Sequence, residues 1–248
     1  METFINEYSW KCLLGKQSKD HKSENSIYTW KVNNKNHFCC NKVLTKEEIE
    51  SLTGYSFHYL NEENIQEIKK YKKIEKQKEV SVIIDLKKFH IKGSKNSGIR
   101  HSINSAKRNN LIIKDNFDKI EDVREMLKEW SNVLGEKYFR DFSGKSEYYF
   151  SNNFHKDCIN LFIYKEDKLI SYASASPNKD CSYITGKALC NKIHGLSEYT
   201  DYLLYNKLIN LGFEKINLGR AEKGLLFYKM KFEGANKINH YNGKIIQD

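Results

Sequence analysis

The sequence predicts an α/β protein in which a mixed sheet is flanked by helices, and three observations lead to this fold class. Residues 181–189 form a short apolar run, as expected for a strand. Leucines then recur at helical spacing until Gly212, with Ser197 as the expected helix cap. Residues 213–218 alternate apolar and polar side chains, and residues 221–231 return to helical spacing. Such a strand–helix–strand–helix order normally implies parallel strands joined by a crossover helix.

The composition allows a substantial core and argues against several function classes. The chain has 248 residues, of which 39% are hydrophobic, enough for one large domain or two small ones. Its six cysteines form no CxxC pair and its histidines show no helical pairing near a carboxylate, so we expect reduced thiols and no metal site. There is no basic-then-apolar leader and no apolar run of about eighteen residues. We therefore expect a cytoplasmic protein without a transmembrane segment.

Short strands separated by turns characterise the first part of the chain, and two helices interrupt them. The expected strands are the apolar or aromatic runs at residues 27–32, 37–44, 55–60 and 80–86. The polar residues 15–26 indicate a loop. Thr45 and Glu48 form a capping-box pattern at the start of a helix over 46–52, and a charged helix is expected over 62–76. This succession predicts a mixed sheet with helices laid on it.

Residues 87–114 carry the most distinctive charge pattern of the chain, whose formal net charge is +10. No acidic residue lies between Asp85 and Asp115, whereas eight lysines and arginines do. A helix over residues 98–110 places four polar groups away from its apolar face: Arg100, Asn104, Lys107 and Arg108. This face is either a solvated surface or an anion-binding surface. Because the helix lacks the glutamates that would pair with these cations, the pattern favours phosphate binding.

Two further segments of the second half indicate substrate contacts. Residues 136–150 are rich in aromatic side chains and contain Arg140 and Asp141, which fits either a substrate-facing loop or a well-packed one. Gly219 and Arg220 follow the second predicted strand of the strand–helix–strand–helix unit. Ligands of open α/β sheets usually bind at the carboxyl ends of the strands, so we expect a site at this turn.

Four motifs in a fixed order resemble one GNAT-like superfamily. They lie at residues 92–111 (KGSKNSGIRHSINSAKRNNL), 130–144 (a tryptophan followed by EKYF and FSG), 200–220 (TDYLLYNKLINLGFEKINLGR) and 224–232 (GLLFYKMKF). They are similar to motifs of the carboxyl-terminal domain of phosphatidylglycerol lysyltransferases and of Fem-type peptidoglycan aminoacyltransferases. The resemblance implies two GNAT-like halves, each with a mixed central sheet flanked by helices. A reduced half is expected at residues 1–85 and an acyltransferase half at residues 86–248.

The resemblance also implies transfer of an aminoacyl group from aminoacyl-tRNA to an amine or hydroxyl, with no further cofactor. Because an aminoacyl ester is already activated, the protein mainly has to position two substrates and stabilise an oxyanion. The lysine of the Fem-type motif matches Lys229, which is the expected oxyanion-stabilising group, with Tyr228 in the aromatic place beside it. Asp141 is expected to orient the acceptor nucleophile or the donor's α-amine. The residues expected to bind tRNA phosphates or substrate are Arg100, Asn104, Lys107, Arg108, Arg140 and Arg220.

The chain departs from the lysyltransferases because it carries no membrane domain, which favours a soluble acceptor such as a small molecule, peptide or protein. An alternative function is that of an acyl-CoA-dependent N-acyltransferase. Those enzymes cradle the CoA diphosphate with a loop of the type (Q/R)xxGx(G/A) before a helix. The corresponding residues here begin at Lys192, keep the central Gly195 and end at Ser197. They would bind a cofactor only if acyl-CoA were the donor.

A second alternative is a non-catalytic tRNA- or RNA-binding module. Such a module would keep the basic segment but would not need Lys229. The two readings differ in where the cations lie. Convergence of Arg100, Arg108, Arg220 and Lys229 on one cleft would favour catalysis, whereas placement on separate faces would favour binding alone.

Overall fold

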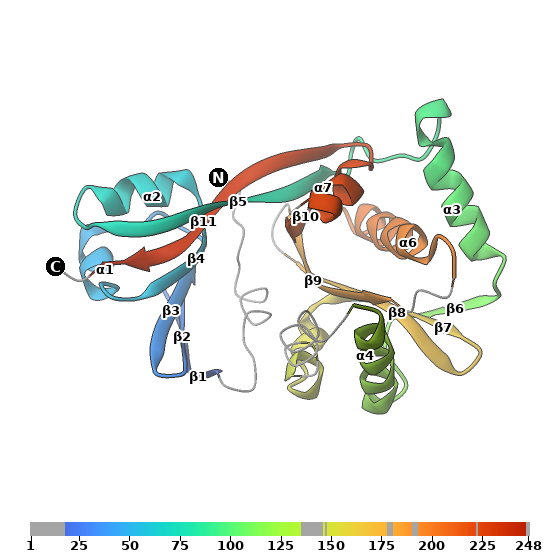
Figure 1. Cartoon of the computed structure of the whole chain (residues 1–248), viewed down its shortest axis with the longest axis horizontal. Coiled ribbons are helices and arrows are strands. Elements are labelled where there is room, and N and C mark those ends of the chain that lie inside the picture. Colours follow the sequence, from blue (N-terminus) through green and yellow to red (C-terminus); the bar gives the residue numbers. More distant parts are fainter. Residues whose placement is uncertain are drawn as a thin grey trace.

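The computed structural model describes residues 18–134, 146, 148–177, 181–189, 193–221 and 223–246, which form one mixed sheet with helices on both faces (Figure 1). The strands of this part of the chain follow the order β1-β2-β3-β4-β11-β5-β10-β9-β8-β7-β6. Their bounds are β1 Ser18–Glu24, β2 Ile27–Val32, β3 Lys35–Cys40, β4 Ser56–Leu60, β5 Ile74–Asp85, β6 Leu111–Lys114, β7 Ile159–Lys165, β8 Lys168–Ser176, β9 Cys181–Leu189, β10 Lys215–Arg220 and β11 Ala235–Ile245. The helices are α1 Lys46–Ser51, α2 Glu62–Lys69, α3 Ser97–Lys107, α4 Ile120–Leu134, α6 Leu196–Asn210 and α7 Lys223–Met230, with short 3₁₀ turns η2 Ser94–Asn96 and η3 Phe154–Asp157. The predicted α/β fold class is confirmed.

Two long antiparallel strands, β5 and β11, join the two halves of the molecule (Figure 1). Their register runs from Ile84 opposite Ala235 to Ile74 opposite Ile245. The sequence patterns do not predict β11, and they place the start of β5 at Val80. Because β11 also pairs with β4, a strand from near the end of the sequence completes the sheet of the first half. The domain boundary expected after residue 85 stays a prediction.

In the first half, α1 and α2 pack on the sheet around a core that includes Phe38, Ile49, Phe57, Ile65 and Ile245. The capping box of α1 is confirmed: Thr45 Oγ1 accepts the amide of Glu48, and the Glu48 carboxylate accepts the amide of Thr45 (2.9 Å). Two predictions are wrong. Helix α2 ends at Lys69, and residues 70–73 turn the chain into β5, which begins at Ile74. Residues 15–26 contain strand β1, whose polar side chains are tolerated because it is an edge strand paired only with β2.

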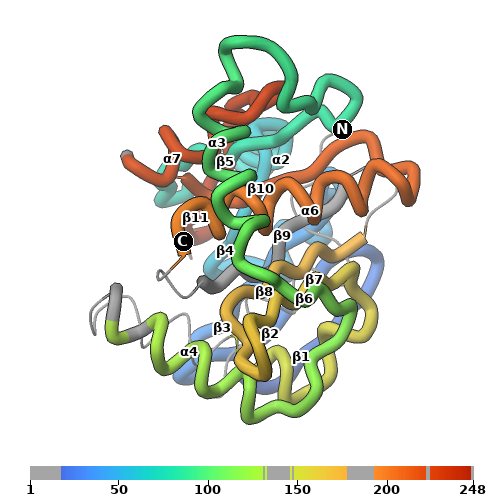
Figure 2. Tube along the Cα trace, turned by 90° about the vertical axis from the view of Figure 1, so that its right-hand side faces the viewer, coloured from blue at the N-terminus to red at the C-terminus, as the bar shows by residue number. Residues whose placement is uncertain are grey.

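In the second half, α3, α6 and α7 cover one face of the sheet and α4 covers the other (Figure 1). The basic helix expected at residues 98–110 is confirmed as α3, and its apolar face is buried through Ile99, Ile103 and Ala106. Figure 2 shows α3 crossing in front of α6. Helix α4 buries Val123, Met126 and Leu127 against the aromatic side chains of β7 and β8.

Strands β9 and β10 are parallel, as the sequence predicts, and α6 is the crossover helix between them. The helix does not start as expected. Its N-cap is Gly195 in a left-handed conformation (φ +77), and Ser197 lies inside the first turn. The hydroxyl of Ser197 donates to the phenol of Tyr228 instead of capping the helix. The expected stop at Gly212 is confirmed by its left-handed conformation (φ +85) just after the helix.

Candidate functional site

The parallel strands β9 and β10 separate at their carboxyl ends, and the expected site lies at this separation. The last residue pair that joins them is Asn217 with Tyr183. Beyond it, β9 continues beside β8, while Arg220 of β10 pairs with Ser81 of β5. Gly219 lies between these two regions of pairing and adopts a left-handed conformation (φ +69) that favours glycine. The fork between two parallel strands is where open sheets commonly bind ligands.

Lys229 lies at this turn because helix α7 folds back onto the end of β10. Its ammonium donates to the carbonyl oxygens of Leu218 (2.5 Å), Gly219 (3.2 Å) and Arg220 (2.8 Å). The side chain is half-buried. An ammonium has three N–H donors, and these three contacts account for them. Lys229 therefore fixes the turn after β10 and holds a positive charge there.

Tyr228 enters a buried polar cluster under α6. Its hydroxyl donates to Oδ2 of Asp201 (2.6 Å) and accepts from the hydroxyl of Ser197 (2.6 Å). Asp201 is almost fully buried. Burial, and next the Asp201 charge, raises the pKa of Tyr228 well above its usual value, so the phenol stays neutral. Lys231 lies 4.0 Å from the centre of the Tyr228 ring and pairs with Glu198, which places a second cation beside the cluster.

Arg220 is held by a buried network on β5 and β11. Its guanidinium pairs with Oε1 of Glu79 (3.0 Å), whose side chain is only 5% exposed. The other carboxylate oxygen of Glu79 contacts Nε2 of His240 (3.1 Å) and accepts from the amide of Asn242 (2.7 Å). Nδ1 of His240 lies 3.1 Å from the hydroxyl of Ser81. Burial, and next the charge of Arg220, lowers the pKa of His240 to about 4, so its ring is neutral at pH 7.

The four predicted binding residues of the basic segment around α3 divide into one with a structural role and three that are exposed. Arg100 donates to the carbonyl oxygens of Ile91 (2.7 Å) and Gly93, so its guanidinium orders the loop before the helix. The other three predicted binding residues of this helix are exposed: Asn104, Lys107 and Arg108. The ammonium of Lys107 lies 5.2 Å from the centre of the Tyr202 ring on α6. The outer face of α3 therefore offers an exposed basic surface next to α6.

The start of α6 is packed tightly against α3. A Cβ atom added to Gly195 would lie 2.0 Å from the carbonyl oxygen of Ser102, so the backbone of α3 fills the space beside this turn. Lys192, the first residue of the expected diphosphate loop, lies outside the described residues. Arg140 and Asp141 also lie outside them.

Of the four groups whose convergence would favour catalysis, two share one turn. Lys229 contacts the carbonyl of Arg220 at the end of β10. Arg100 lies on α3 and is bonded to the loop before that helix, and Arg108 is the C-cap residue that follows it. The structure thus places Lys229 beside the backbone of Arg220 and the other two groups at a separate helix, so the four groups do not all converge on one cleft.

Sequence reasoning missed three buried groups around this turn: Glu79, Asp201 and His240. Glu79 and His240 could not be paired in advance because β11 was not predicted. Asp201 did leave a signal, since it lies four residues after Ser197 on one helix face, where both reach Tyr228. Within the described ranges, no three His, Cys, Asp or Glu side chains are grouped to hold a metal ion. None of the described helices combines the length and apolarity needed to cross a bilayer.

The fold is similar to solved structures over nearly the whole chain. The carboxyl-terminal domain of a protein described as a lysylphosphatidylglycerol synthetase from Agrobacterium fabrum matches with a TM-score of 0.72 at 13% identity, covering 98% of this chain and 89% of that one. The protein L-PGS from Bacillus licheniformis matches at 0.69 and 14% identity (97% and 87% covered), and FemX at 0.58 and 10% identity (96% and 90% covered). No protein-family model and no curated protein sequence matches. These likenesses confirm the GNAT-like fold implied by the four motifs.

Proposed function

We propose that this protein transfers an aminoacyl group from aminoacyl-tRNA to an amine or hydroxyl of an acceptor. The acceptor is a soluble small molecule, peptide or protein, and the reaction takes place in the cytoplasm, where charged tRNA is available. The fold likeness to a lysylphosphatidylglycerol synthetase domain and to FemX supports the transferase class. The observation that carries the choice of donor is the packing of the basic helix α3 against the start of α6.

That packing supports tRNA over acyl-CoA as the donor. A CoA diphosphate would need the backbone amides at the start of α6 to be open to it. Here the carbonyl of Ser102 lies against Gly195, which leaves no room for even one added carbon on that side of the turn. The same helix presents Lys107 and Arg108 outward, and exposed cations on one helix face suit a phosphate backbone.

The chemistry proposed at the fork needs few groups. The acceptor's nitrogen or oxygen attacks the ester carbonyl, a new C–N or C–O bond forms, and the ester bond to the terminal ribose breaks. The proton lost by the acceptor ends on the released ribose hydroxyl, so the reaction is balanced without a cofactor. Lys229 would stabilise the oxyanion through the charge it holds at the end of β10. A direct hydrogen bond to the oxyanion would require release of one of its three backbone contacts.

The other groups would bind or orient. Tyr228 is a neutral phenol whose single O–H is donated to Asp201, so it is suited to hold the turn and a substrate in place rather than to exchange a proton. Arg220, held in place by Glu79, would bind an anionic part of either substrate. Asp141 and Arg140 stay candidates for orienting the acceptor or the donor's α-amine.

Binding of charged tRNA, uncharged tRNA and acetyl-CoA to the purified protein at two salt concentrations tests the proposal. The Lys107→Ala/Arg108→Ala variant should weaken tRNA binding and reduce the slope of log affinity against log salt by about two units, one for each lost phosphate contact. The matched control, Lys119→Ala/Arg124→Ala around the start of α4, should leave the slope unchanged. Saturable acetyl-CoA binding without preference for tRNA over other polyanions would refute the tRNA donor.

A further inference from the structure

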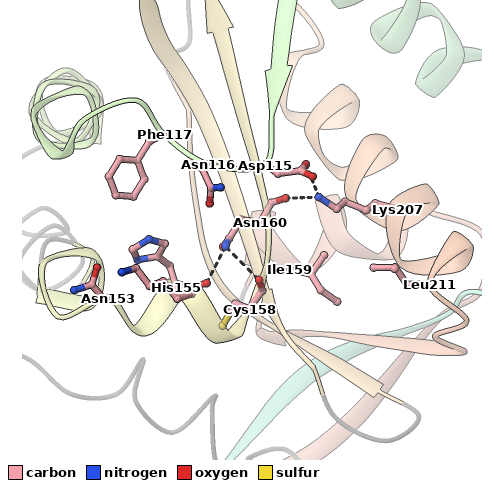
Figure 3. A pocket seen from close by; sticks show the side chains of 11 residues that line it. Asp115, Asn116, Phe117, Asn153, His155, Cys158, Ile159, Asn160, Lys207 and Leu211 are labelled. Atoms are coloured by element: carbon pink, nitrogen blue, oxygen red, sulfur yellow. Dashed lines mark hydrogen bonds and ion pairs between the residues drawn. The ribbon is translucent and has the colours of Figure 1, made fainter.

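A cavity of about 690 Å³ opens at the edge of the sheet that carries β6 and β7 (Figure 3). Its walls come from the connection between β6 and α4, from η3 and the start of β7, and from the last turns of α6. Strands β8 and β9 lie between β7 and β10 in the sheet, so the cavity is separate from the turn that holds Arg220 and Lys229. Its volume is in the range of small-molecule sites.

His155 gives the cavity a buried polar atom in need of a partner. The residue is 5% exposed, and among the described residues its Nδ1 has no hydrogen-bond partner. Its backbone carbonyl accepts the amide of Asn160 (2.8 Å), which fixes the segment. The imidazole packs against the ring of Phe117, with centroids 5.0 Å apart. Because buried polar atoms are normally paired, the free nitrogen calls for a ligand atom or a bound water.

Lys207 supplies a cation that the backbone positions in the cavity, whose lining also includes Lys156. Its ammonium donates to the backbone carbonyl of the buried Asn160 (2.9 Å) and to Oδ1 of Asp115 (2.5 Å), which leaves one N–H donor. The side chain of Asp115 is 75% exposed, so its ion pair contributes little and its carboxylate can swing into solvent. An anionic ligand group can therefore take the place of the Asp115 carboxylate on a lysine that the backbone already positions.

Another part of the lining is aromatic or carries amide groups, and Ile159 and Leu211 add apolar surface. In Figure 3 the rings of Phe117 and His155 and the amide of Asn116 lie around one space, with Asn153 beside them. Aromatic faces stack on nucleobases, and asparagine amides match the donor and acceptor pattern of base edges. Two lysines line the cavity, Lys156 and Lys207, and together they suit a single phosphate group. Together these features describe a ligand with a heteroaromatic ring and a single phosphate.

We propose that this cavity binds a nucleoside monophosphate unit, with the base stacked on Phe117, its edge toward His155 and the phosphate on Lys207. The unit is either a free nucleotide or the phosphorylated end of an RNA chain, since both present the same groups. A ring heteroatom of the base pairs with Nδ1 of His155, and the phosphate displaces Asp115 from Lys207. This site does not depend on the transfer reaction proposed at the fork.

Calorimetric titration of the full chain with AMP, adenosine and ribose 5-phosphate tests the site. AMP should bind saturably and more tightly than either of its parts. Lys207→Gln should weaken AMP about tenfold or more, the value of one hydrogen bond to a charged group. Phe117→Leu should weaken AMP about tenfold and leave ribose 5-phosphate unchanged, because only the base stacks.

Asp115→Asn gives the readout that a merely damaged fold cannot produce. Removal of the competing carboxylate should tighten AMP by up to about fivefold, the upper value of an exposed ion pair. The matched control is Asp118→Asn, which removes a carboxylate paired with Lys114 and should change nothing. No saturable AMP binding in the millimolar range, or AMP binding that is the same in Lys207→Gln and wild type, would overturn the proposal.

A short RNA oligonucleotide, with and without a 5′-phosphate, distinguishes the two sources. If RNA ends are the ligand, the phosphorylated oligonucleotide competes with AMP, binds more tightly than AMP and responds to Lys207→Gln and Asp115→Asn in the same directions. If free nucleotides are the ligand, AMP binds with the expected variant effects and the oligonucleotide does not compete. If the oligonucleotide binds wild type and both variants with the same affinity and AMP does not bind, the result contradicts the proposed site.

Discussion

Protonation of His240 should destabilise the fold by an amount that the structure allows us to work out. The residue is fully buried, between Glu79 and Ser81 and under the ring of Tyr59. Its pKa is lowered from 6.5 to about 4 by burial and by Arg220. The folded state therefore binds fewer protons than the unfolded state between these pH values, and the free energy of unfolding falls as pH falls through this window. At about 1.4 kcal/mol per pKa unit, the loss is roughly 3 kcal/mol.

The assay is urea denaturation at a series of pH values from 7 to 4, on wild type and on His240→Gln. The variant should be less stable at pH 7, because it disturbs the contacts of Glu79, but its stability should fall less steeply below pH 6.5. His37 and His155 also have pKa values lowered by burial, so the informative quantity is the difference between variant and wild type. His90→Gln removes an exposed imidazole and serves as the control. Parallel curves for His240→Gln and wild type would refute the reasoning.

Substitutions at four further positions test the turn and its surroundings by denaturation. Gly195→Ala should cost about 2 kcal/mol or more, because the added carbon meets the α3 backbone at a left-handed position, whereas Gly98→Ala faces open space and should stabilise α3 by up to about 1 kcal/mol. Equal effects of the two changes would contradict the packing argument. Tyr228→Phe should cost about 1–3 kcal/mol, since it leaves a buried carboxylate without its phenol donor. Lys229→Met should destabilise α7, and Lys229→Arg should not restore it, because a planar guanidinium cannot place one nitrogen among three carbonyls. Full recovery by arginine would show that charge alone matters.

The parts of the fold that local sequence determines were predictable. The capping box at Thr45, the basic helix α3 and the parallel order of β9 and β10 depend on residue spacing, and all three are confirmed. Strand β11 was not predictable, because its residues are mostly polar and half-exposed. Their order comes from pairing with β5 and β4. The prediction of a loop at edge strand β1 was wrong for the same reason, since a polar edge strand resembles a loop in sequence.

The candidate site was predictable in position but not in its contacts. The glycine and arginine that end β10 located the turn, and the Fem-type motif placed Lys229 beside it. Nothing in the sequence shows that the Lys229 ammonium is bound by three carbonyls, because those contacts depend on how α7 folds back. The salt bridge between Arg220 and Glu79 joins residues far apart in the chain, on strands β10 and β5, and follows from strand pairing alone.

The most direct test of the proposed transfer is hydrogen exchange at the turn after β10 and along α7, measured with three ligands. These are a non-hydrolysable aminoacyl-tRNA analogue, the same tRNA uncharged, and acetyl-CoA. If the aminoacyl end reaches Lys229, the charged analogue should slow exchange at Gly219, Arg220 and α7 more than uncharged tRNA does, and acetyl-CoA should leave these amides unchanged. Equal protection by charged and uncharged tRNA, or protection by acetyl-CoA at the start of α6, would contradict aminoacyl transfer at this fork.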